Sequence, residues 1–332
     1  MVAGPHPVGG SEPVTPTAAR TNLLRVEAVL AIAAIGIWVL VTGLFAQVGY
    51  DAITYLAAGE RLNADHLLYA LQAGDRYVAP NPPYWTAPLL YPPLIGVVWR
   101  PLAAMPGLTG FWLWMAADVL AMLWAVWYVI RGLRWSSIAL IAACSIGVGL
   151  QLTIGNVAGF FVAGMILCWV YRDRPWTGAI VGLMVVLKIT PFVLVLWLLG
   201  QRRWGALAWC GGAIAAGLAI GVAGAGLQAH FTYLDVMASA LPQPWSVSGM
   251  THIGQATTIV QIVGCALILL TRRNPALSYR VAVLTMFLGS PAIGIQSPAI
   301  LVALGAPGSE HRRAAEAGAP ATAAAVRPGL PA

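Results

Sequence analysis

The chain has very little charge for its length. Of its 332 residues, 9% are charged, whereas a soluble domain contains nearer 25%. Hydrophobic residues make up 59%, and the mean hydropathy is +0.79. This balance excludes an ordinary soluble globular protein and predicts an all-α polytopic integral membrane protein.

Cysteine and metal-binding patterns are also scarce. The four cysteines all lie inside apolar runs and show no CxxC spacing, which excludes a disulfide framework or a zinc site. No Asp-x-Asp pair occurs, and we expect no metal and no cofactor. The net charge of +7 comes from basic pairs scattered between apolar runs, so it does not indicate nucleic-acid binding.

The two ends have tail-like compositions. Residues 1–24 and 306–332 are rich in Pro, Gly, Ala and Thr, and we expect both to be disordered cytoplasmic tails around a membrane domain at 25–305. The first apolar run, 26–48, is too long for a signal peptide and predicts a retained transmembrane helix.

The basic residues predict a topology. Arginine pairs follow most of the later apolar runs, which are 108–130, 135–150, 154–171, 176–200, 205–227, 254–271 and 278–305. All pairs are cytoplasmic only if 176–200 and 278–305 are broken hairpins, turning at Thr190-Pro191 and at Gly289-Ser290-Pro291. That arrangement gives about ten segments with both termini cytoplasmic. Two ordinary proline-kinked spans are the alternative.

The only lysine in the chain, Lys188, lies in the middle of an apolar run. A cation at that depth needs a partner, either a bound anion or a structural acid such as Asp118. Each half of a broken hairpin is too short to span a bilayer, so it must line a cavity. We expect that cavity on the outer side, with Lys188 and Ser290 near its floor.

The largest polar stretch, 49–107, follows the first span and is predicted to be an outer loop. Asp51, Tyr55, Ala58 and Arg61 share one face of a helix over 51–61, although Asp51 could instead cap that helix. An interfacial helix is expected at 89–106, and a second outer loop at 228–253 carries His252.

An ordered set of motifs resembles glycosyltransferase family 87. It comprises Asp51 with Tyr55 and the run 57–62, then Leu68-Tyr69, Tyr91-Pro92-Pro93-Leu94, Gly155-Asn156-Val157, Leu187-Lys188-Ile189-Thr190-Pro191 and Arg202-Arg203-Trp204. The resemblance covers roughly 25–305. It implies a GT-C fold, and a mannosyltransferase that uses a polyprenyl-phosphate sugar donor, a lipid or glycolipid acceptor and the outer face of a bacterial cell membrane.

The resemblance also implies roles for individual residues. Asp51 would be the catalytic base, with inversion at the anomeric carbon, because a phosphate leaving group needs no general acid. Lys188, then Arg61, and Tyr55 would bind the donor. The further candidate substrate contacts are Tyr91, Asn156, His252 and Ser290.

One departure keeps other classes open. Family members carry Trp and His after a late Ser-Pro, but here Ser290-Pro291 is followed by 292–296 without either residue. A non-catalytic GT-C-like subunit is therefore an alternative. A lipid or ion transporter is another, because broken helices and a buried lysine also occur there.

Overall fold

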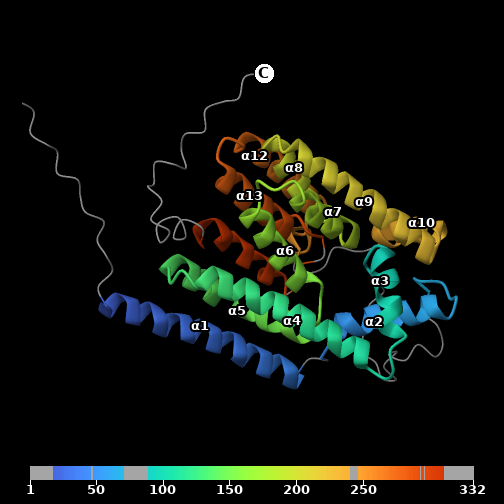
Figure 1. Ribbon diagram of the computed structural model, residues 1–332, viewed down its shortest axis with the longest axis horizontal. Coiled ribbons are helices and arrows are strands. Elements are labelled where there is room, and N and C mark those ends of the chain that lie inside the picture. The colour runs from blue at the N-terminus through green and yellow to red at the C-terminus, as the bar shows by residue number, and fades with distance from the viewer. Residues whose placement is uncertain are drawn as a thin grey trace, which may run out of the picture.

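The computed structural model describes residues 18–45, 48–70, 89–239, 246–291, 293–294 and 296–309, and within these ranges the chain is helical without strands (Figure 1). The helices are α1 Ala18–Phe45, α2 Tyr50–Asn63, α3 Leu94–Ala103, α4 Thr109–Ile130, α5 Trp135–Ile154, α6 Ala158–Val170, α7 Thr177–Leu187, α8 Phe192–Gly200, α9 Trp204–Ala225, α10 Leu227–Ser239, α11 Val247–Thr251, α12 Ala256–Leu270, α13 Pro275–Leu288 and the 3-10 helix η1 Ser297–Gly305.

Four helices in the described part of the chain are long and apolar enough to cross a membrane: α1, α4, α5 and α9. The outward faces of α1 and α9 are covered with exposed apolar side chains, among them Leu40, Leu44, Leu218 and Ile220. A surface of this kind suits hydrocarbon and not water, since it leaves large apolar areas without protein contacts. The protein is therefore a polytopic membrane protein, as predicted.

Two pairs of helices run parallel. The hydroxyls of Thr42 in α1 and Thr153 in α5 lie 2.8 Å apart, and Trp38 packs one turn earlier against Gly149. In the same way, Asp118 of α4 lies against Gly159 at the start of α6, and both helices then continue toward basic loops. The beginnings of α1 and α5 and the ends of α4 and α6 therefore share one end of the bundle.

The short helices α7 and α8 form a hairpin. Glycines of α7 lie against the backbone of α9 in register, with Gly178 against Ala206 and Gly182 against Cys210, so α7 and α9 are parallel. Because α8 connects them, it must run in the opposite direction. The guanidinium of Arg203, just before α9, accordingly donates a hydrogen bond to the carbonyl of Arg172, just before α7. The turn lies between Leu187 and Phe192, where the sequence predicts it.

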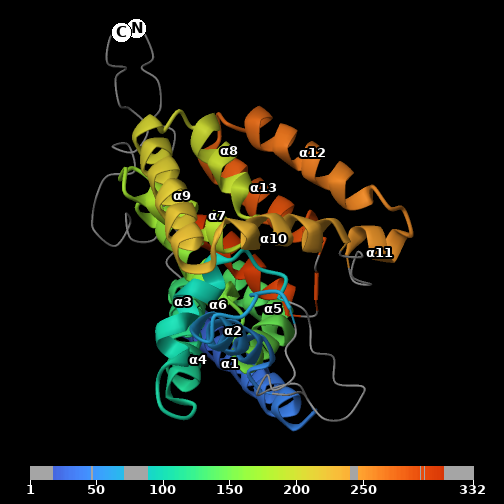
Figure 2. The same cartoon turned by 90° about the vertical axis from the view of Figure 1, so that its right-hand side faces the viewer.

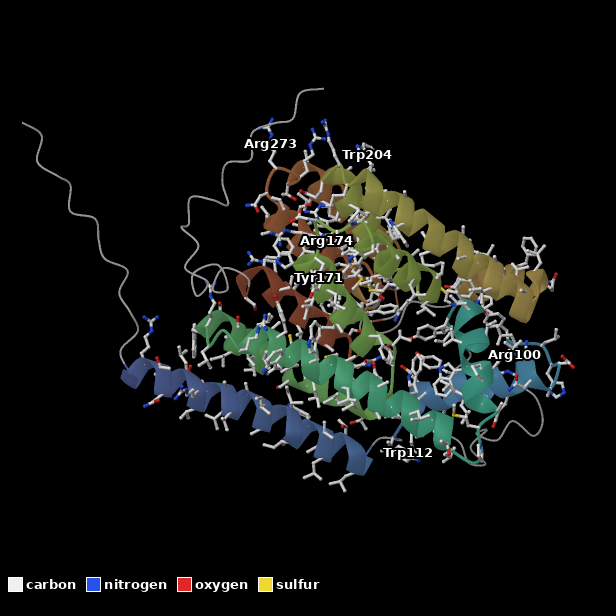
Figure 3. All side chains as sticks on the ribbon, viewed as in Figure 1. Arg100, Trp112, Tyr171, Arg174, Trp204 and Arg273 are labelled. Atoms are coloured by element: carbon white, nitrogen blue, oxygen red, sulfur yellow. The ribbon has the colours of Figure 1, made fainter. Side chains whose placement is uncertain are left out.

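The last segment folds back too. After α13, the chain passes Ser290 into η1, whose end is held near the start of α5 by a 2.9 Å hydrogen bond from Arg134 to the Gly308 carbonyl. The hydroxyl of Ser309 also donates to the carbonyl of Val129, at 3.3 Å. As a result, the arginine pairs gather at one end of the bundle, at positions 20/25, 131/134, 172/174, 202/203 and 272/273. Figure 3 shows Arg174, Trp204 and Arg273 toward this end and Arg100 at the other.

Several boundaries differ from those expected. Helix α1 already begins at Ala18, so residues 18–24, expected to belong to a tail, are helical. The segment 228–253, predicted to be a second outer loop, contains most of α10 and all of α11, which lie across the end of the bundle (Figure 2). The predicted interfacial helix is α3, which passes through Pro101. Residues 1–17, 71–88 and 310–332, which include most of both predicted tails and part of the predicted first outer loop, lie outside the described residues.

Candidate active site

Helix α2 starts at a sharp turn. Gly49 has a positive φ of 73°, and a Cβ there would lie 2.2 Å from the ring of Phe111. Its amide donates to the Thr153 carbonyl at 2.8 Å, which ties the start of α2 to the end of α5. Gly49 occupies the N-cap position, so the alternative that Asp51 caps the helix is wrong. The carboxylate of Asp51 instead faces the rest of the protein.

Asn156 holds that carboxylate. It follows Gly155, whose positive φ of 69° ends α5, and its side-chain amide donates hydrogen bonds to Asp51 Oδ2 and, at 2.7 Å, to the Tyr91 hydroxyl. The Asn156 Oδ1 accepts from the Ala158 amide at 3.0 Å. Both N–H groups and the oxygen of the Asn156 side chain therefore have hydrogen-bond partners, which fixes its orientation.

Lys188 completes the group. It is the extended residue between α7 and α8, and its Nζ lies 5.2 Å from the centroid of the Tyr91 ring, within cation–π range. Its charge also acts on Asp51. Asp51, Tyr91, Asn156 and Lys188 thus form one group, which we call the Asp51 cluster.

Burial sets the protonation of the cluster. It raises the pKa of Asp51, although the Asn156 hydrogen bond and the Lys188 charge act in the opposite direction. Burial also raises the pKa of Tyr55 and of Tyr91, so both phenols stay protonated. A carboxylate with a raised pKa is a stronger base than a free one, provided that it is ionised.

Tyr55 forms the wall beside the cluster. Its side chain is fully buried, and its ring packs edge-on against Tyr91 at 5.0 Å and Trp114 at 5.9 Å. Trp99 lies 6.0 Å away on another side. Tyr55 therefore contacts the site, as its spacing from Asp51 predicts.

The other candidates lie elsewhere. Arg61 is buried near the far end of α2, about 15 Å along the helix axis from Asp51. His252 is exposed and follows α11 with a positive φ of 56°. Ser290 is buried at the turn after α13, next to the carbonyl of Gly289, which binds Gln261. None of the three is a member of the Asp51 cluster.

A pair of buried polar residues, Gln151 and Asp118, lies next to Asn156 of the cluster. Gln151 Nε2 donates to Asp118 Oδ2 at 3.1 Å and to the Asn156 carbonyl at 2.5 Å. Asp118 also faces the amides of Gly159 and Phe160 at the start of α6, where a negative charge is favoured. The partners of Asp118 are thus Gln151 and a helix N-terminus, whereas the charged neighbour of Lys188 is Asp51. Sequence reasoning did not single out Gln151; its only signal is an amide within an apolar run.

Comparison with known proteins identifies the family. The profile of Glycosyltransferase family 87 matches residues 89–291, which is more than half of the chain. The chain belongs to this family. The matched range contains Tyr91, Asn156 and Lys188, whereas Asp51 precedes it.

A curated relative agrees with this assignment. The polyprenol-phosphate-mannose-dependent alpha-(1-2)-phosphatidylinositol pentamannoside mannosyltransferase of Mycolicibacterium smegmatis is 30% identical over 197 residues, covering 55% of this chain and 46% of the relative. The chain therefore spans about half the length of the curated relative it matches. No solved structure matches the chain.

Proposed function

We propose that the protein is a membrane glycosyltransferase that moves mannose from a polyprenyl-phosphate donor to a lipid or glycolipid acceptor at the outer membrane face. Membership of glycosyltransferase family 87 supports the reaction type, and the name of the relative supports the donor. The observation that carries the proposal is the Asp51 cluster, in which Asn156 and Tyr91 connect a carboxylate with the only lysine of the chain.

In the proposed reaction, the acceptor hydroxyl oxygen attacks the anomeric carbon of the donor sugar. The bond from that carbon to the phosphate oxygen breaks, and the electron pair leaves with the phosphate. Asp51 takes the proton of the hydroxyl, and attack from the face opposite the phosphate inverts the anomeric carbon. The phosphate leaves as an anion, so one carboxylate is sufficient.

Lys188 has the charge that the departing phosphate needs. A fixed cation near the leaving group stabilises the negative charge that develops there, most strongly where water is excluded. Helix α8 begins four residues after Lys188, so its positive N-terminal end lies on the same side as the lysine. Asn156 and Tyr91 are proposed to orient Asp51 and to line the sugar position.

The distribution of arginines supports an outer active site. The arginine pairs lie at the end of the bundle opposite α2 and the Asp51 cluster. Because basic residues are retained on the cytoplasmic side, that end would be cytoplasmic, together with the start of α1. The Asp51 cluster would then face outward. With the two hairpins counted, the chain would have about ten membrane segments, and α2, α3, α10 and α11 would lie at the outer surface.

Asp51→Asn tests the proposal. With purified protein in lipid nanodiscs, a labelled polyprenyl-phosphate mannose and a mannosylated glycolipid acceptor, we expect turnover to fall about 10²- to 10⁴-fold. Donor affinity should persist, since the amide keeps the shape of the carboxylate. Asp65→Asn is the matched control, because Asp65 is exposed after α2 and outside the cluster. An Asp51→Asn protein that transfers mannose at the normal rate would refute the assignment of the base.

A further inference from the structure

Helix α10 presents two different faces close to the end of α2. Leu227, Phe231 and Leu234 are 58%, 54% and 57% exposed. Their spacing places them in one stripe along the helix, and Figure 2 shows α10 lying across the end of the bundle. A helix of this kind, with an exposed apolar stripe, is suited to lie in the membrane interface.

The neighbouring stripe of α10 lines a cavity. Gln228, Thr232 and Val236 follow each other at four-residue intervals, and together with Ala229 they border a space of about 300 Å³. The opposite wall is the chain segment from His66 to Ala70, which follows α2, and Ala225 at the end of α9 closes one side. The cavity therefore lies between the end of α2 and the interfacial helix.

This cavity is joined to the Asp51 cluster through a tyrosine. The ring of Tyr69 stacks against Tyr233 of α10, with 6.3 Å between centroids and 29° between planes. The Tyr69 hydroxyl donates to the carbonyl of Tyr91 at 2.7 Å, and the side chain of Tyr91 belongs to the cluster. The cavity wall and the proposed base are thus parts of one connected structure.

The polar groups of the cavity suit a ligand that is rich in hydroxyls. The Thr232 hydroxyl donates to the Gln228 carbonyl at 3.0 Å, and the Tyr69 hydroxyl donates to Tyr91, so each oxygen keeps acceptor lone pairs for another donor. His66 and the Gln228 side chain add further donor and acceptor atoms. Between these groups the lining is apolar and aromatic, which is typical of a pocket for a small organic group.

We infer that this cavity is the subsite for the sugar head group of a membrane-anchored acceptor, with the lipid chains lying along the apolar stripe of α10. The inference rests on the proposed function, which requires an acceptor hydroxyl near Asp51. It explains why one helix carries a lipid-facing stripe directly beside a polar cavity. The donor is not placed there, because its phosphate is proposed to meet Lys188 on the other side of Tyr91.

A binding measurement tests this without depending on turnover. The probe is a fluorescent mannosylated glycolipid, titrated onto the full-length protein in nanodiscs. We expect Thr232→Trp to weaken binding about tenfold or more, because the indole fills the space of the sugar. Gln228→Leu should weaken it by about three- to tenfold through lost hydrogen bonds, and position 228 is exposed, so this variant should fold. Ala219→Trp is the matched control, since Ala219 is exposed on α9 and lies outside both the cavity and the apolar stripe of α10.

Competition identifies what the cavity recognises. Methyl mannoside should displace the probe from the wild-type protein, whereas the same lipid without sugar should not. Unchanged probe affinity in both cavity variants, equal competition by the sugar-free lipid, or a loss of donor affinity instead of acceptor affinity would overturn the inference. Intact probe binding by a wild-type protein that transfers no mannose would refute the proposed function while leaving the subsite standing.

Discussion

Replacing Asn156 by Ala should shift the pH dependence of sugar transfer. The Asn156 amide donates to Asp51 and stabilises its ionised form, so its hydrogen bond keeps the pKa of Asp51 lower than burial alone would set it. Without that bond, the pKa of Asp51 rises. The base acts only when ionised, so activity falls as the pH drops through this pKa.

The size of the shift follows from one hydrogen bond to a charged group. Such a bond contributes about 1.5–3 kcal/mol. One pKa unit corresponds to about 1.36 kcal/mol, so the pKa of Asp51 should rise by about 1 to 2 units. The acid limb of the pH profile of kcat/KM should move to higher pH by that amount, and its alkaline plateau should change less.

The assay is mannose transfer by protein in nanodiscs between about pH 4 and pH 9, the range in which a perturbed carboxylate titrates. Asn63→Ala is the matched control, because Asn63 is the last residue of α2 and binds Arg100, outside the Asp51 cluster. Its acid limb should stay in place. An Asn156→Ala enzyme that retains the wild-type acid limb would refute the argument that Asn156 tunes the base.

Three further changes test the charges and the topology. Lys188→Met should lower donor affinity and cut turnover about 10²-fold or more, because it removes the cation that is proposed to meet the departing phosphate; a folded Lys188→Met protein with normal donor affinity and rate would contradict that role. Asp118→Ala should lower the unfolding free energy by about 1–3 kcal/mol, because it leaves a buried N–H of Gln151 without its acceptor; the check is thermal unfolding against wild type, and an unchanged melting temperature would count against it. In a cysteine-free background, a membrane-impermeant maleimide should label Asp65→Cys but not Arg174→Cys in intact cells, and the reverse pattern would invert the proposed topology.

Much of the helical framework could be predicted because its signals are local. Apolar runs predicted α4, α5 and α9 within a few residues, whereas α1 begins at Ala18, eight residues before the run predicted for it. The helix break after Lys188 could be predicted because proline cannot donate a backbone hydrogen bond and restricts the residue before it. The shared face of Asp51 and Tyr55 follows from the helical repeat.

The partners of the base could not be predicted in the same way. Asn156 is 105 residues from Asp51 along the chain, and Tyr91 is 65 residues from Asn156, so no periodic pattern relates them. The family motifs contain all three residues, but a motif does not give a contact. For Arg61, the helical repeat predicted the correct face of α2, but it did not take account of the distance along the helix axis, which puts Arg61 too far from Asp51.

Helix α10 was missed for another reason. Its polar and aromatic residues are typical of an outer loop, and the sequence argument treated 228–253 as one. The spacing of Leu227, Phe231 and Leu234 nevertheless fits one stripe of an interfacial helix. Hydropathy alone cannot find such a helix, because half of its surface faces polar groups.

The site and the breaks in the helices have one physical cause. Backbone groups freed from a helix inside a membrane remain unsatisfied unless protein or water binds them. Here the breaks at Gly49, at Gly155 and between Lys188 and Pro191 all occur at the same end of the bundle, where Asn156 and the Thr153 carbonyl take up freed groups. Groups that satisfy broken helices are themselves polar, and polar, partly dehydrated groups are those that bind a charged sugar donor well. The same interruptions that weaken the helices therefore supply the base and the cation that the proposed reaction needs.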